Sequence, residues 1–208
     1  MSMNLYLRRV SAADVARYRR HGVDDSDLDI LDEAPAAAAF TRLWELERGF
    51  VAREGVAAFS IAAREMLAEP LVQGASAGRR GPLLDLHKSW RMLHFLFTGE
   101  AWEGELPAAT LLAGGREVGE DLGDGPARVV SIEETAGFAR FLKRLDHATL
   151  LGRLDARAMK ALGIYCAGNA DPDAVAELKD DLAHYFPRLR AFVADASARR
   201  EGLLIWML

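Results

Sequence analysis

Hydrophobic side chains recur at helical spacing most densely over residues 85–98. At about 100° per residue, one narrow stripe of this segment is apolar, and two further apolar positions widen it on one side. The stripe consists of Leu86, Trp90, Leu93 and Phe97, widened by Met92 and Leu96. Asp85 can cap the amino end of such a helix, and Gly99 can end it. The pattern therefore predicts a helix over residues 85–98 with one face in the core.

Another flank of this predicted helix is polar, with His87, Arg91, His94 and Thr98 one turn apart. Seven residues of helical rise separate the two histidines by roughly 10 Å, so they cannot share one metal ion. Arg91 lies one turn from each histidine and would lower their pKa values if all three faced one space. Such a ridge would suit an anionic or carbonyl-bearing ligand. The alternative is a half-buried His94 bonded to backbone and a solvated Arg91.

Hydrophobic segments at the two chain ends predict strands. Met3, Leu5 and Leu7 alternate with residues of the other face, as in a half-buried strand. Residues 203–207 form a continuous apolar run of strand length, which fits a strand covered on both faces. We expect these two strands to pair with each other. Residues 129–130 are a third, shorter candidate strand.

Several helices are marked by residues that cap the first turn. Ser131 with Glu134 forms a capping box, and Ser11 with Asp14 resembles one. The remaining candidate N-caps are Asp146, Asp155 and Asp171, the last followed by Pro172. Pro187 should kink or restart the last helix. These patterns predict an α+β fold, in which a small mixed or antiparallel sheet containing the N- and C-terminal strands packs against many helices.

An acidic stretch and a helix-rich segment follow the first predicted helix. Acids alternate within residues 24–33 as in a calcium-binding loop, but the ordered glycine and closing glutamate of an EF-hand are missing. We therefore expect a solvated turn or an acidic docking edge there. Residues 35–82 show helical spacing that ends in a loop, and Trp44 is expected in the core. We predict a single domain over residues 1–208, with 35–82 as a candidate helical elaboration.

A second informative stretch, residues 114–128, holds five glycines within twelve positions, which lets the backbone approach another group closely. No Gly-Lys-Ser/Thr closes it, so it is not a Walker-type phosphate loop, and its four carboxylates would repel a phosphate. We predict a loop that presents Glu120 and Asp121 to a cationic or hydroxyl-bearing group, with Arg128 as counter-charge. The alternative is a tight connection whose Arg128 pairs with its own acids.

Composition limits the function classes. The chain has 208 residues, of which 50% are hydrophobic, enough for one well-filled core. A net charge of −5 argues against a nucleic-acid binder. No apolar run approaches the roughly 20 residues that span a bilayer. The single cysteine, Cys166, allows no internal disulfide, is expected to be a small apolar filler, and fits a reducing compartment, so we expect a cytoplasmic protein. No motif indicates a cofactor or a metal ion.

The two informative stretches together resemble the YfbM-like family of small bacterial proteins, a family of unknown function. The first motif is LHKSW at residues 86–90, which runs into LHFLFTG at 93–99. The second has glycine at 115, VG at 118–119 and DLGDGPAR at 121–128. The chain departs from the family at His87, where an acid is common, and at Asp124, where an aromatic is common. The resemblance implies a mixed α/β domain in a bacterial cytoplasmic protein and supplies no reaction.

Two functions follow from these candidate residues. The first is a binding protein, with an immunity-like role included, whose cleft between helix 85–98 and loop 114–128 receives a small polar ligand or a partner protein. The second is a hydrolase- or transferase-type enzyme, in which His94 acts as general acid or base and an acid of the loop orients it. In that case Arg91 or Arg128 would hold an anionic substrate. The candidate site residues are Trp90, Arg91, His94, Thr98, Glu120, Asp121 and Arg128.

Overall fold

A computed structural model describes residues 3–28, 81–164, 168 and 170–208 of the chain. The expectations for residues 29–80, including Trp44, and for Cys166 lie outside this part. In chain order, the described elements are β1 (Leu5–Val10), α1 (Ala12–His21), α2 (Asp25–Leu28), β2 (Leu83–Asp85), η1 (His87–Ser89), α5 (Trp90–Thr98), α6 (Thr110–Ala113), β3 (Arg116–Asp121), β4 (Pro126–Val130), α7 (Ile132–Lys143), α8 (His147–Arg153), α9 (Ala156–Ala161), α10 (Pro172–Ala198) and β5 (Gly202–Met207).

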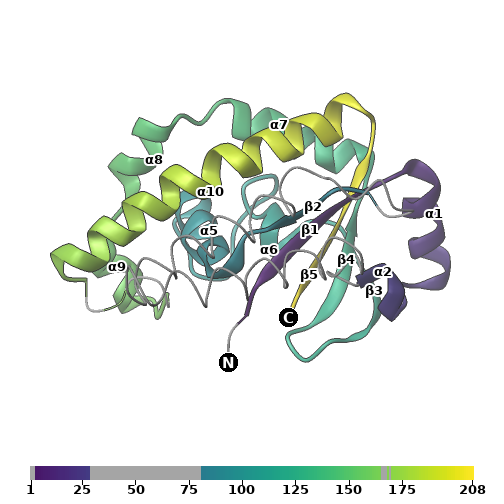
Figure 1. The fold of residues 1–208 in the computed structure, drawn as a ribbon, viewed down its shortest axis with the longest axis horizontal. Coiled ribbons are helices and arrows are strands. Elements are labelled where there is room, and N and C mark those ends of the chain that lie inside the picture. The colour runs from purple at the N-terminus through teal and green to yellow at the C-terminus, as the bar shows by residue number, and fades with distance from the viewer. Residues whose placement is uncertain (1–2, 29–80, 165–167, 169) are drawn as a thin grey trace, which may run out of the picture.

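The strands form one antiparallel sheet in the order β2-β1-β5-β4-β3 (Figure 1). The first and last strands lie side by side inside it, and Leu7 is opposite Ile205. The predicted pairing of the two chain ends is therefore confirmed, as is the α+β class. β5 has a neighbouring strand on each edge, and its two faces are both covered, by α7 and α10 on one side and by α1 on the other, which explains why its sequence is apolar at successive positions.

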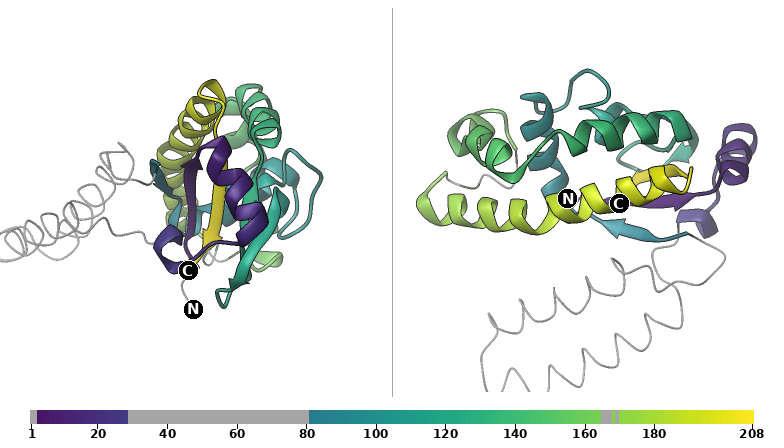
Figure 2. Two further views of the ribbon diagram at one scale, coloured as in Figure 1. Left: turned by 90° about the vertical axis from the view of Figure 1, so that its right-hand side faces the viewer. Right: turned by 90° about the horizontal axis from the view of Figure 1, so that it is seen from above.

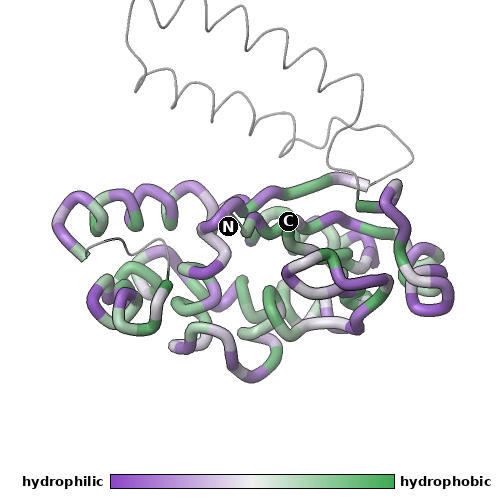
Figure 3. Tube along the Cα trace, turned by 90° about the horizontal axis from the view of Figure 1, so that it is seen from below, coloured by the Kyte–Doolittle hydropathy of each residue, from purple (hydrophilic) through white to green (hydrophobic). Residues whose placement is uncertain are grey.

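Helices cover the sheet unevenly. α5, α7 and α10 pack on one face, and α1 lies against the other (Figure 2). Each face has its own apolar cluster: Leu5 and Leu7 of β1 belong to the larger one, and Tyr6 between them belongs to the smaller one. Along α10 the inward side of the tube is hydrophobic and the outward side hydrophilic (Figure 3). None of the helices in the described ranges is long and apolar enough to cross a membrane.

The predicted capping residues begin their helices as expected. Ser131 and Glu134 form the reciprocal capping box of α7, with each side chain bonded to the other residue's backbone. The N-caps of α1, α8, α9 and α10 are Ser11, Asp146, Asp155 and Asp171. Pro187, however, lies inside α10, which continues from Pro172 to Ala198 as one helix. The expected restart at this proline therefore does not occur.

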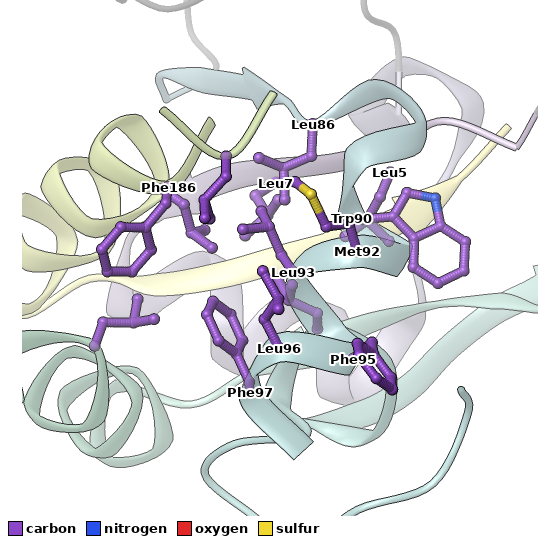
Figure 4. Close-up of a cluster of buried hydrophobic side chains, with 14 of the residues drawn as sticks. Leu5, Leu7, Leu86, Trp90, Met92, Leu93, Phe95, Leu96, Phe97 and Phe186 are labelled. Carbon is purple, nitrogen blue, oxygen red and sulfur yellow. The ribbon is translucent and has the colours of Figure 1, made fainter. Parts of the chain in front are cut away.

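The helix predicted over residues 85–98 is shorter than its pattern suggested. Asp85 ends strand β2, and its carboxylate accepts a hydrogen bond from the backbone N–H of His87 at 2.6 Å. His87 has a positive φ of 45°, which breaks the regular helix at that point. The α-helix begins at Trp90 and ends at Gly99, whose left-handed conformation closes it as expected. Leu93, Leu96 and Phe97 project from it into the same interior as Phe186 of α10 (Figure 4).

The predicted glycine-rich loop at residues 114–128 is a β-hairpin. β3 and β4 pair with a register shift between Val118 and Asp121, and the turn between them contains Gly123 and Gly125, both with positive φ. The Asp121 carboxylate accepts hydrogen bonds from the N–H groups of these two glycines, at 2.8 and 3.1 Å. The glycines therefore serve a tight turn and a bulge in the strand, and they do not form an open loop.

Candidate functional site

His94 of α5 is fully buried beneath the segment that follows this helix. Its exposed fraction is 0%, and its Nε2 is 3.0 Å from the carbonyl oxygen of Glu103. Thr98 acts one turn later, where its hydroxyl donates to the His94 carbonyl at 2.8 Å and accepts from the N–H of Glu100 at 3.0 Å. Both side chains therefore fasten residues 99–104 to the end of α5. Neither contacts Asp121 or Glu120, which lie at the exposed tip of the hairpin.

Burial lowers the pKa of His94 below its ordinary value, and the hydrogen bond to the Glu103 carbonyl opposes this shift only in part. The folded protein thus keeps His94 neutral at a pH where the unfolded chain has already protonated it. Because the unfolded state then binds more protons, the free energy of unfolding should fall as the pH decreases below about 6.5. The contribution of His94 is fully present above that pH and disappears as the pH falls towards the lower folded pKa.

Urea denaturation at pH 7.5, 6.5 and 5.5 would measure this dependence. His94→Gln, which keeps a donor that can reach Glu103, should lose less stability than the parent between pH 7.5 and 5.5. His147→Gln on the exposed surface of α8 is the matched control and should keep the slope of the parent. Equal slopes for His94→Gln and the parent would mean that His94 does not carry the effect.

Arg128 is a buried structural cation. Its exposed fraction is 8%, and its guanidinium donates to the backbone carbonyls of Thr110 at 3.5 Å and Gly114 at 2.8 Å, and also to that of Leu111. These carbonyls lie in and just after α6. That of Thr110 also accepts the Gly114 N–H at 3.1 Å, whereas the other two lie where the end of a helix leaves acceptors without intrahelical partners. Burial lowers the pKa of Arg128 to about 10, and the nearby Glu117 carboxylate works against the shift, so the group stays charged at neutral pH.

Trp90 and Arg91, the first two residues of α5, differ in burial, since Trp90 is fully buried and Arg91 is half-buried. Trp90 has an exposed fraction of 0%, and its indole N–H donates to the Met3 carbonyl at 3.1 Å. The Arg91 guanidinium lies 4.5 Å from the ring centroid of Trp102, which is 52% exposed. Trp90 is therefore a core residue, and Arg91 stacks on an exposed indole.

These placements correct the predicted site. The seven candidates do not line one hollow between α5 and the hairpin, because His94 and Arg128 are buried against backbone carbonyls while Glu120 and Asp121 are exposed at the hairpin tip. The alternative of a His94 bonded to backbone holds, with the ring fully rather than half buried. Arg128 and His94 nevertheless have similar roles, since each fastens part of the segment between α5 and β3.

That segment forms one wall of a surface cleft with a volume of about 570 Å³. The opposite wall is α7, which runs beside the segment in both views of Figure 2. The lining residues are Leu106, Pro107, Thr110 and Gly114 on the first wall and Glu134, Gly137, Arg140, Lys143 and Arg144 on the second. The cleft thus lies next to the predicted location and uses residues that the sequence reasoning did not select.

The α7 wall is strongly basic. Arg140, Lys143 and Arg144 are exposed, and within the described ranges no ion pair joins any of them to a carboxylate. The acid of this wall is Glu134, whose carboxylate already accepts the N–H of Ser131 at 2.8 Å in the capping box. The cleft therefore has an excess of positive charge at one end.

Gly137 leaves the middle of the α7 wall open. It lies inside a helix, where glycine costs about 0.5–1 kcal/mol relative to alanine. A Cβ added there would meet no atom within 4 Å, so the packing of the fold does not require a glycine. Its missing side chain enlarges the cleft. This helical glycine and the three cations within five residues are the sequence signals that could have located the cleft. Among the described residues, no cluster of three potential metal ligands occurs.

The five-stranded antiparallel sheet and its helices define this chain as an α+β protein with a ligand-sized surface cleft. The profile of a domain of unknown function, DUF1877, matches residues 1–206, and the chain therefore belongs to the DUF1877 family. The structure of the protein of unknown function YfbM from Escherichia coli is similar, with a TM-score of 0.59, 14% sequence identity and 99% of each chain covered. The resemblance to YfbM-like proteins is thus confirmed, and at this identity it shows the fold alone. No curated protein matches the chain.

Proposed function

We propose that this protein binds a small molecule in the cleft between residues 106–114 and α7. The observation that carries the proposal is the volume of about 570 Å³, which lies within the range of about 300–1,000 Å³ typical of small-molecule sites. A cytoplasmic setting is part of the proposal, since a single cysteine allows no internal disulfide.

Preorganisation of the first wall supports this function. Arg128 holds the carbonyls of Thr110 and Gly114, which both line the cleft, and His94 holds Glu103 shortly before it. The hydroxyl of Thr110 is itself bonded to the Pro107 carbonyl at 2.7 Å. A wall fixed from behind by buried polar groups loses little conformational freedom when a ligand binds, which favours affinity.

The polar groups of the cleft favour binding over catalysis. A general acid–base mechanism needs a titratable group that is within hydrogen-bond reach of the ligand and free to exchange a proton. The Glu134 carboxylate is already used in the capping box, and the hydroxyl of Thr110 donates to backbone. The three cations of the α7 wall can bind a ligand through charge-assisted hydrogen bonds to an acidic group.

The test uses N-phenyl-1-naphthylamine, an uncharged dye whose fluorescence rises in an apolar site. Gly137→Leu adds a side chain to the open space of the cleft and should weaken dye binding by about tenfold or more. Gly152→Leu is the matched control, because Gly152 is also a helical glycine with nothing within 4 Å of an added Cβ but does not line the cleft. It should bind the dye as the parent does.

Gly137→Ala is the second variant, in case leucine perturbs the helix. Alanine fits the open space, so it should raise the free energy of unfolding by about 0.5–1 kcal/mol while reducing dye affinity less than leucine does. Circular dichroism and urea denaturation would check that each variant is folded. A parent that fails to bind the dye, or equal affinities in the two leucine variants, would contradict the proposed cleft function.

A further inference from the structure

We infer that the cleft takes an amphipathic anion, a molecule in which an apolar chain or ring is joined to one acidic group. This inference rests on the proposed function and specifies its ligand class. The two walls differ in chemistry, since Leu106 and Pro107 belong to the first wall and Arg140, Lys143 and Arg144 to the second. A ligand that fits both walls must carry an apolar part and a negative charge.

The three cations are close enough to act on one acidic group. Arg140 and Arg144 are four residues apart on α7, and Lys143 is three residues from Arg140, so all three lie on adjoining positions of the last helical turn. Like charges at these spacings destabilise a helix, although the carboxyl end of the helix dipole offsets part of the repulsion. The Arg140 Nε donates to the Ala136 carbonyl at 3.2 Å, which leaves the other guanidinium nitrogens for an anion.

The acidic residue that lines the cleft, Glu134, lies away from the three cations. Glu134 lies almost two turns before the first of these cations, and its carboxylate binds the Ser131 N–H at 2.8 Å. The Arg19 guanidinium also approaches this carboxylate, at 3.8 Å. The negative charge of Glu134 is therefore already matched, and the positive end of the cleft is complementary to an anion from outside the chain.

The apolar half of the ligand is indicated by the first wall. Leu106 has an exposed fraction of 54%, and the adjoining Pro107 presents an apolar ring surface at the cleft. Gly137 on the second wall adds no side chain, so an alkyl chain or an aromatic ring can lie between the walls. An inorganic anion alone would leave this apolar surface uncovered.

Two dyes that differ by a single sulfonate test the charge. We expect 8-anilinonaphthalene-1-sulfonate to bind the parent at least about fivefold more tightly than the uncharged N-phenyl-1-naphthylamine. In the triple variant Arg140→Gln/Lys143→Gln/Arg144→Gln, this ratio should fall to about one, because the sulfonate loses the three cations that would bind it. Added salt should reduce the ratio in the parent, because the three cations are exposed to solvent.

The control removes three exposed cations from other helices, as Arg20→Gln/Arg157→Gln/Lys179→Gln. It changes the net charge equally and should keep the ratio of the parent. Equal affinities for the two dyes in the parent, or a ratio that survives in the α7 triple variant, would overturn the inference. If Gly137→Leu still weakened binding of the uncharged dye relative to Gly152→Leu in that case, the proposed function would stand and only the ligand class would fail.

Displacement of the sulfonate dye from the parent tests both halves and identifies the acidic group. Octanoate or octyl phosphate should displace it at concentrations at least about tenfold lower than 1-octanol or inorganic phosphate. The more effective of the two amphiphiles identifies the acid as a carboxylate or a phosphate, and either result supports the inference. Displacement by inorganic phosphate as effective as that by octyl phosphate would refute the apolar half.

Discussion

Replacement of Trp90 by alanine should lower the free energy of unfolding by about 3–5 kcal/mol, as measured by urea denaturation. The indole is fully buried within the larger apolar cluster and stands at the first turn of α5 (Figure 4). Its N–H donates to the Met3 carbonyl at 3.1 Å, so the same side chain also fastens the start of the first strand. Truncation would remove both the packing and this bond, and would leave a cavity beside the sheet.

Trp102→Ala is the matched control, because the two indoles lie 6.0 Å apart between ring centroids and differ in burial. Trp102 is 52% exposed, so its loss should change the free energy of unfolding by less than about 1 kcal/mol. Trp90→Phe should fall between them and lose about 1 kcal/mol for the hydrogen bond to Met3. Equal effects of the two alanine variants would show that Trp90 is not the core residue that its burial indicates.

The starts of most helices described here, and the first and last strands along the chain, were predictable because their signals are local. A capping box such as Ser131 with Glu134 satisfies backbone donors within one turn, whatever the rest of the chain does. The N- and C-terminal segments were recognisable as strands from the alternation along residues 3–8 and the continuous apolar run of β5, although β1 is buried on both faces and not on one. Such features depend on spacing along the chain, which the sequence contains in full.

The hairpin could not be predicted in the same way. In β3 only Val118 is buried, so the strand lacks the alternation that marks a half-buried strand. Its glycines and acids are typical of a loop, and what makes it a strand is the backbone pairing with β4. Pairing of that kind is a tertiary interaction. An exposed edge strand such as β3 need not contain the β-branched and aromatic residues that are typical of buried strands.

The candidate site failed for a different reason, which concerns residue type. A histidine or an arginine near glycines indicates a ligand site, but the same types also satisfy buried backbone carbonyls, as His94 and Arg128 do here. Conversely, Arg140 and Lys143 near the end of α7 match the ordinary preference for cations at a helix carboxyl terminus. Only the position of residues 106–114 opposite that helix turns these cations into part of a cleft.

Arg128→Met should lower the free energy of unfolding by about 2–4 kcal/mol, although it keeps a long and largely apolar side chain. The guanidinium donates to three carbonyls in and after α6 from a position that is 8% exposed, and methionine offers no donor to those of Leu111 and Gly114. Arg128→Lys keeps the charge but not the forked geometry, and it should recover only part of the stability. Arg140→Met, at an exposed position of α7, should change stability by less than about 0.5 kcal/mol.

The same variant connects stability to the cleft. Since Thr110 and Gly114 line the cleft and are held by Arg128 from behind, the loss of its hydrogen bonds should loosen the first wall. We expect Arg128→Met to bind N-phenyl-1-naphthylamine several-fold more weakly than the parent at a temperature where both are folded, because a mobile wall must be ordered when the dye binds. If stability fell and dye affinity did not, Arg128 would hold the fold together without shaping the cleft.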